Sequence, residues 1–214
     1  EINIRENSIF INIMAEFTIS EDQRDMIKDV LETGGKRAAE SISMMIGSSV
    51  EAEVANIHED AYSLYEKEIE KENLGLIVYS DLKRGEGGIT MYIMYEESAK
   101  KLSNVLLGRD KDEPIDDFGE DEMSAIKEIG NIVIGNFLGE VSDYFETSIL
   151  HTPPKIVHDM VGIYFENVIG YTAMLEDAII ADVSLSAKGV GIDGKYILIP
   201  SDKLTEEFVK FLNS

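Results

Sequence analysis

Apolar residues recur at two different spacings along this chain, and each spacing indicates a different kind of element. In some segments they return every three or four positions, as in an amphipathic helix, and in others they alternate, as in a strand. The first pattern predicts helices at residues 20–45, 60–71, 97–107, 119–145, 156–169 and 201–212. The second predicts extended segments at residues 50–57, 74–80, 89–95, 147–152, 178–187 and 195–199. Residues 1–17 alternate only weakly, so we treat 1–18 as an N-terminal leader without an assigned role.

The same order of elements occurs twice. A constant shift of 99 residues places Ile46, Gly47 and Val50 beside Phe145, Glu146 and Ile149, which indicates an internal duplication. Two copies of such a unit are expected to pair their hairpins into one antiparallel sheet that is covered by the long helices. We therefore predict an α+β fold with pseudo-twofold symmetry, formed by one domain at residues 19–214. Its halves would be 19–108 and 119–214, joined by an acidic connector at 109–118.

Charge and composition narrow the possible partners. The chain has 42 acidic and 19 basic residues, and its formal net charge of -23 disfavours nucleic acids and anionic membrane surfaces. It contains no cysteine, which removes thiolate chemistry and is compatible with a reducing cytoplasm. Neither a signal-peptide pattern nor an apolar run of membrane-spanning length is present. We expect a cytoplasmic protein.

Two other sequence patterns resemble ligand-binding sites, but neither supports a bound metal or dinucleotide. The histidines at positions 58, 151 and 158 have no paired spacing on one helix face, so we expect no metal cofactor bound by this chain. Gly189, Gly191 and Gly194 form a GxGxxG sequence, but a strand is predicted next, where a dinucleotide site needs a helix. We predict a hairpin there.

The helix predicted at residues 119–145 carries a polar stripe opposite its apolar side. At about 100° per residue, the stripe contains Ser124, Glu128, Asn131, Gly135, Gly139 and Ser142, and the opposite side contains Ile126, Ile129, Val133, Phe137, Val141 and Tyr144. Since the apolar side must face the core, Glu128 and Asn131 should face solvent or a partner. A glutamate and an asparagine three positions apart also occur by chance on solvated helices, so the stripe alone assigns no function.

Ser124, Glu128 and Asn131 are followed, after 22 intervening residues, by Pro154. These four positions match the extended signature of the CheC, CheX and FliY phosphatases, and IKEIGNIVIGNFLGEVSDYF resembles the repeated helix of that family. The chain thus resembles the CheC family of chemotaxis phosphatases. The resemblance implies hydrolysis of the aspartyl phosphate on a CheY-type response regulator. It assigns Asn131 to orienting the attacking water and Glu128 to docking the regulator, which would hold the magnesium ion.

The first half departs from the signature at the glutamate, asparagine and proline positions. The same shift matches Glu128, Asn131, Gly135, Gly139 and Pro154 with Asp29, Glu32, Lys36, Glu40 and Ala55. A carboxylate at Glu32 cannot donate a hydrogen bond to water and would repel a phosphoryl group, while Lys36 and Glu40 would obstruct a docking partner. We therefore predict one working site, formed by Glu128 and Asn131, and a silent Asp29/Glu32 pair.

The resemblance also implies alternatives. The protein could be a catalytically weak adaptor that binds the receptor deamidase CheD. Residues 156–169 are apolar around most of the predicted helix, which is consistent with either burial or a surface for CheD. A flagellar-switch component of the FliY kind is disfavoured because no additional domain follows residue 212. Two pseudo-symmetric halves in one chain reduce the need for a homodimer, so we expect a monomer.

Overall fold

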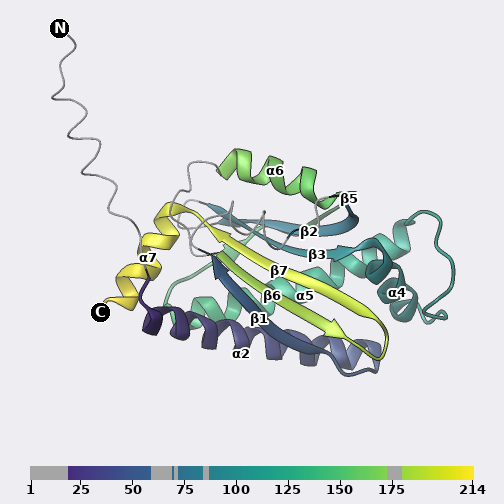
Figure 1. Cartoon of the computed structure of the whole chain (residues 1–214), viewed down its shortest axis with the longest axis horizontal. Helices are drawn as coiled ribbons and strands as arrows, with labels where there is room; N and C mark the ends of the chain where they lie inside the picture. Colours follow the sequence, from purple (N-terminus) through teal and green to yellow (C-terminus); the bar gives the residue numbers. More distant parts are fainter. Residues whose placement is uncertain (1–18, 59–68, 70–71, 84–86, 173–179) are drawn as a thin grey trace, which may run out of the picture.

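The structure, a computed structural model, describes residues 19–58, 69, 72–83, 87–172 and 180–214 (Figure 1). The predicted leader at 1–18 lies outside the described residues. So does the helix predicted at 60–71, except for Ile69, which is buried.

One antiparallel sheet runs through the whole molecule. Its order is β1 (Glu51–His58), β6 (Ile180–Ala187), β7 (Ile192–Pro200), β3 (Gly88–Tyr95) and β2 (Leu74–Lys83). Beyond β2, two short strands, β4 (Leu150–His151) and β5 (Lys155–Met160), both pair with β2.

The strand order is symmetric about its centre, where Tyr92 of β3 pairs with Tyr196 of β7. Each half provides a hairpin, β2–β3 or β6–β7, and each edge strand lies against the hairpin of the other half. Thus β1 pairs with β6, while β5 pairs with β2. This confirms the predicted α+β duplication with a central antiparallel sheet.

The helices cover the two sheet faces unequally. The long helices α2 (Glu21–Ile46) and α5 (Glu120–Tyr144) lie on one face, and α6 (Val161–Thr172) lies on the other (Figure 1). The helices α4 (Glu96–Leu106) and α7 (Asp202–Leu212) add Leu102 and Phe208 to the core beneath the long helices. Within the described segments, no helix combines the length and apolar character needed to cross a membrane.

Alternation along the strands gives each face its own core, because successive side chains point to opposite sides. Val78 and Tyr92 join the large core under α2 and α5, whereas their neighbours Ile77 and Met91 join a smaller core under α6. Both sides of β2 and β3 are therefore buried, and these strands form a rigid platform for α5.

Local signals explain where the long helices begin. The Ser20 side chain accepts a hydrogen bond from the Gln23 backbone N–H at 3.2 Å, and Gln23 Oε1 accepts one from the Ser20 backbone N–H at 2.9 Å. This capping box satisfies backbone donors that α2 leaves unpaired. Ser201 likewise caps α7 by accepting from the Leu204 N–H at 3.3 Å.

The prediction for residues 156–169 is wrong in its first part. Residues 156–169 were expected to form one helix, but residues up to Met160 belong to β5, and α6 begins only at Val161. The apolar residues Ile156, Val157 and Met160 fit either element. These residues form a strand because they pair with β2, where Ile156 lies opposite Val78 and Val157 lies opposite Ile77.

Candidate functional site

The polar side of α5 faces outward, as the sequence predicts. Ser124 and Glu128 are exposed, and Asn131, one turn after Glu128, is half-buried. Gly135 and Gly139 continue this line, and a Cβ built on either would meet no described atom within 4 Å. We call these five residues the α5 ridge. It offers one acid and one amide beside open space.

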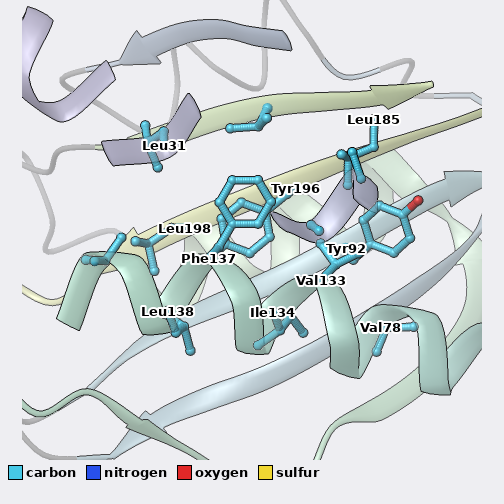
Figure 2. Close-up of a cluster of buried hydrophobic side chains, with 14 of the residues drawn as sticks. Leu31, Val78, Tyr92, Val133, Ile134, Phe137, Leu138, Leu185, Tyr196 and Leu198 are labelled. Atoms are coloured by element: carbon cyan, nitrogen blue, oxygen red, sulfur yellow. The ribbon is translucent and has the colours of Figure 1, made fainter. Parts of the chain in front are cut away.

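The core fixes the rotation of this helix. Ile126, Ile129, Val133 and Phe137 are 0% exposed on the opposite side of α5. The Phe137 ring stacks on the ring of Tyr196 in β7, with centroids 4.0 Å apart and planes 7° apart (Figure 2). A rotation of α5 about its axis that buried Glu128 would remove these aromatic and aliphatic groups from the core. The core therefore holds the α5 ridge outward.

Ser142, predicted on the same stripe, has a structural role at the end of α5. Its hydroxyl accepts a hydrogen bond from the backbone N–H of Ile149 at 3.2 Å, which ties the chain after the helix back onto it. Tyr144, predicted on the apolar side, is half-buried and packs edge-on against Phe145.

The start of α5 is anchored by the connector, which sequence reasoning left without structure. Glu122 Oε2 accepts the Gly119 backbone N–H at 3.0 Å, and its other carboxylate oxygen pairs with Arg109. The hydrogen bond from Arg109, together with backbone donors, holds the pKa of Glu122 below its usual range. A glutamate three residues after a helix start is a capping signal that could have revealed part of this link.

Pro154, the fourth signature position, lies in the bend between β4 and β5. Residue Thr152 in this bend is held to β2 by two hydrogen bonds with Asp81. The Thr152 N–H donates to the Asp81 carbonyl at 2.9 Å, and the Asp81 N–H donates to Thr152 Oγ1 at 3.1 Å. The counterpart of Pro154 is Ala55, at the register shift between Val54 and Asn56 in β1. Proline is tolerated at such edge-strand irregularities because no ladder hydrogen bond is lost there.

The first half presents the same helix face with different chemistry. Asp29 is exposed and Glu32 is half-buried on α2, which matches the placement of Glu128 and Asn131 on α5. Glu32 Oε2 lies 3.8 Å from Lys36 Nζ, and Glu40 is exposed one turn further on. Where the α5 ridge has an amide beside open space, α2 has an ion pair and a second acid.

The other candidate sites have structural explanations. His151 Nδ1 lies 2.9 Å from the Thr152 carbonyl, His158 Nε2 lies 3.9 Å from Glu96 Oε2, and the His58 side chain is outside the described residues. No three His, Asp or Glu side chains of the described part converge to hold a metal ion. The glycine cluster forms the predicted β6–β7 hairpin, with Gly191 in the left-handed region at φ 71°.

The large apolar side chains of the region predicted as a possible CheD surface are mostly buried or half-buried. Val161 and Phe165 are 0% exposed in the small core, and Val168 is 9% exposed. Ile163 is the exception among the described large apolar side chains of α6, with 47% exposure. The apolar character of this segment is therefore explained chiefly by packing against the sheet.

Comparisons with known proteins agree with the sequence signature. Residues 122–158 match the CheC-like family, and this stretch contains Ser124, Glu128, Asn131 and Pro154. The chain is 28% identical over 180 residues to a protein named CheY-P phosphatase CheC from Bacillus subtilis, covering 78% of this chain and 81% of that protein.

Solved structures share the fold at low sequence identity. FliY from Thermotoga maritima matches with a TM-score of 0.70 and 16% identity, over 92% of this chain and 98% of that one. A chain of the FliG-FliM complex from H. pylori matches with a TM-score of 0.60 and 13% identity, over 92% and 100% of the two chains. The family match and the relative thus confirm the predicted resemblance to the CheC family, and the solved structures show a shared fold.

Proposed function

We propose that this protein hydrolyses the aspartyl phosphate of a CheY-type response regulator that docks on the α5 ridge. The observation that carries the proposal is the outward presentation of Glu128 and Asn131, one helical turn apart, beside the open space over Gly135 and Gly139. The relative named CheY-P phosphatase CheC supports the same substrate class.

The chemistry requires little beyond positioning. An acyl phosphate already has a good leaving group, so catalysis depends on placing a water in line behind phosphorus. The water oxygen bonds to phosphorus while the bond from phosphorus to the aspartate oxygen breaks. The aspartate leaves as a carboxylate, and the protons of the water remain with inorganic phosphate and solvent.

A carboxamide suits this task because it can accept and donate hydrogen bonds at once without a net charge. The Asn131 carbonyl oxygen would accept a hydrogen bond from the water, which orients a water lone pair toward phosphorus. Its NH₂ group remains available to a phosphoryl oxygen. A carboxylate at the same place could do only the first and would repel the phosphoryl group.

Glu128 would set the register of docking through a lysine of the regulator. It is exposed on α5, so it can pair with a partner without leaving a buried charge. We infer that the magnesium ion of the reaction is held by the regulator and that this chain supplies no cofactor. The protein would act as a cytoplasmic monomer, with residues 19–214 as one CheC-like domain.

The test is a comparison of matched variants. A CheY-type regulator phosphorylated with acetyl phosphate is mixed with wild type, Asn131→Ala or Glu32→Ala, and phosphate loss is followed. We expect Asn131→Ala to abolish most of the acceleration, by about 100-fold. Glu32→Ala, at the equivalent place on α2, should change it less than about twofold, since surface substitutions away from a site have small effects. Equal losses from both would contradict a single working site.

The second candidate is an adaptor that binds CheD without useful catalysis. The replaced chemistry on α2 shows that one ridge of this chain already lacks the signature residues, and Ile163 on α6 offers an exposed apolar contact. Tight binding of the regulator or CheD with unchanged dephosphorylation would favour this role. Accelerated dephosphorylation that depends on Asn131 would reject it.

A further inference from the structure

Helix α5 lies very close to the sheet at Gly130, directly before Asn131. A Cβ at Gly130 would lie 2.5 Å from Cβ and Cγ1 of Val78 and 2.7 Å from its Cγ2. Ordinary carbon contacts are about 3.5–4.0 Å, so an alanine would require a separation of roughly 1 Å. Val78 is 0% exposed in β2, beside α5 (Figure 2), and its branched side chain has little freedom to move.

The first half approaches the sheet at a different place, where a Cβ at Gly35 of α2 would lie 2.9 Å from the Cβ of Ala52 in β1. The position equivalent to Gly130 in α2 is Leu31, which is 2% exposed in the same core. A full leucine side chain therefore fills the space inside α2, whereas α5 has no side chain at that place. At this position, only the half with the signature brings its helix backbone against the sheet without an intervening side chain.

The same strand also holds the bend that contains Pro154. Val78 lies directly against Gly130 of α5. Asp81, three residues later in β2, makes both hydrogen bonds to Thr152. Strand β2 thus fixes the spacing between α5 and the β4–β5 bend. Exposed apolar groups, Leu150 at 54% exposure and Pro153, are available to a partner beside this bend.

Asn131 lies on the flank of the α5 ridge that borders the core. Ile134 and Leu138, three and seven residues later, share this flank and are 0% and 2% exposed. The amide therefore emerges at the boundary between the exposed ridge and packed structure. A displacement of α5 relative to β2 would change the surroundings of Asn131 more than those of the exposed Glu128.

We propose that Gly130 is a positioning residue, which holds Asn131 at the depth needed for a regulator that docks on the α5 ridge and the β4–β5 bend together. This inference rests on the proposed function, because it concerns the same site. It predicts that catalysis depends on the Gly130–Val78 contact although neither residue touches the substrate.

The test uses Gly130→Ala in the full chain. We expect kcat for dephosphorylation to fall by about 10- to 100-fold, because misplacement by 1 Å can have that effect. KM should change by less than about threefold, since Glu128 stays exposed on the helix. Val78→Gly removes all three contacting atoms, so the double variant should recover kcat to within about threefold of wild type.

Leu31→Ala is the matched control. It should lower the melting temperature by removing a buried leucine, yet leave kcat within about twofold, since α2 carries no working site. If Gly130→Ala does not fold, Val78→Ile enlarges the other side of the same contact and should lower kcat severalfold. A loss of kcat in Leu31→Ala equal to that in Gly130→Ala, or no recovery in the double variant, would overturn the positioning role.

A crystal structure of Gly130→Ala separates this inference from the proposed function. The distance between the Cα atoms of Asn131 and Thr152 should differ from that in wild type by about 1 Å and return in the double variant. An unchanged distance would reject the positioning role even in an active phosphatase. Wild type that fails to accelerate dephosphorylation would reject the proposed function, and the distance alone would then decide the role of Gly130.

Discussion

At the scale of single residues, the two halves differ in the charge of a few equivalent side chains. Glu32 occupies on α2 the place that Asn131 occupies on α5, and it pairs with Lys36, where α5 has Gly135. Exposed ion pairs of this kind contribute little to stability, so the pair does not explain the fold of α2. Its consequence is local, because a charged, occupied surface replaces an amide beside open space.

Glu122 links the acidic connector to helix α5 through its pair with Arg109. This link leads to a prediction about how stability depends on pH. Because the pairing with Arg109 lowers its pKa, the contribution of Glu122 to stability is complete above its unfolded pKa, about 4.3. That contribution is lost as the pH falls through the lower folded value. Glu122→Gln should therefore reduce the free energy of unfolding at pH 7 by roughly 0.5 to 1 kcal/mol, and the difference should be smaller at pH 3. Urea unfolding at both pH values measures it.

The neighbouring Glu120→Gln is the control for this prediction. It removes the same charge from the first turn of α5, but Glu120 is exposed. Its effect should be smaller at pH 7. A loss for Glu122→Gln that is equal at both pH values would show that the ionised carboxylate is not the stabilising form.

At the scale of elements, periodicity predicted the long helices well and the short edge elements poorly. The predicted range 119–145 differs from α5 by one residue at each end, because a strong apolar face and clear end signals act together there. The β5 strand was missed because its pairing with β2 is decided by distant residues. The outward direction of Glu128 and Asn131 followed from the helix period. The sequence did not predict the Arg109–Glu122 pair or the Gly130–Val78 contact, because each joins two segments that share no sequence pattern.

The uncrowded face of α5 gives a prediction that belongs to the whole helix. Gly135→Lys places on the α5 ridge the residue that α2 has at Lys36. We expect the fold to be retained, because the new Cβ meets no described atom within 4 Å. Docking should be obstructed, so KM for the phosphorylated regulator should rise by about tenfold or more while kcat changes less. Steady-state kinetics at several regulator concentrations checks this split.

Gly189→Lys adds the same side chain to the exposed turn between β6 and β7 and is the control for added charge. It should leave KM within about twofold of wild type, as expected for a surface substitution away from a docking face. If Gly135→Lys binds the regulator as well as Gly189→Lys does, the α5 ridge is not where the regulator docks.

At the scale of the whole molecule, the two halves are interleaved rather than merely adjacent. β1 belongs to the first half but is separated from β2 and β3 by β6 and β7 of the second half. β5 belongs to the second half and lies at the opposite edge, on β2. The repeat was visible in the sequence through its constant shift, whereas the exchange of edge strands was not, because a repeat of elements does not specify which hairpin each strand joins.

This exchange predicts how the chain responds to being cut in the connector. Residues 19–108 alone would leave β1 without β6, and residues 119–214 alone would leave β5 without β2. Each fragment would also expose the inner side of its long helix, which in the second fragment includes Phe137. We expect each fragment by itself to show little native circular dichroism, because burying that surface is the main source of stability.

Mixed in equal amounts, the two fragments should form a one-to-one complex with the far-ultraviolet spectrum of the intact protein. Analytical ultracentrifugation measures that stoichiometry, and a first-half fragment that folds as a stable monomer would show that the exchanged strands do not hold the molecule together.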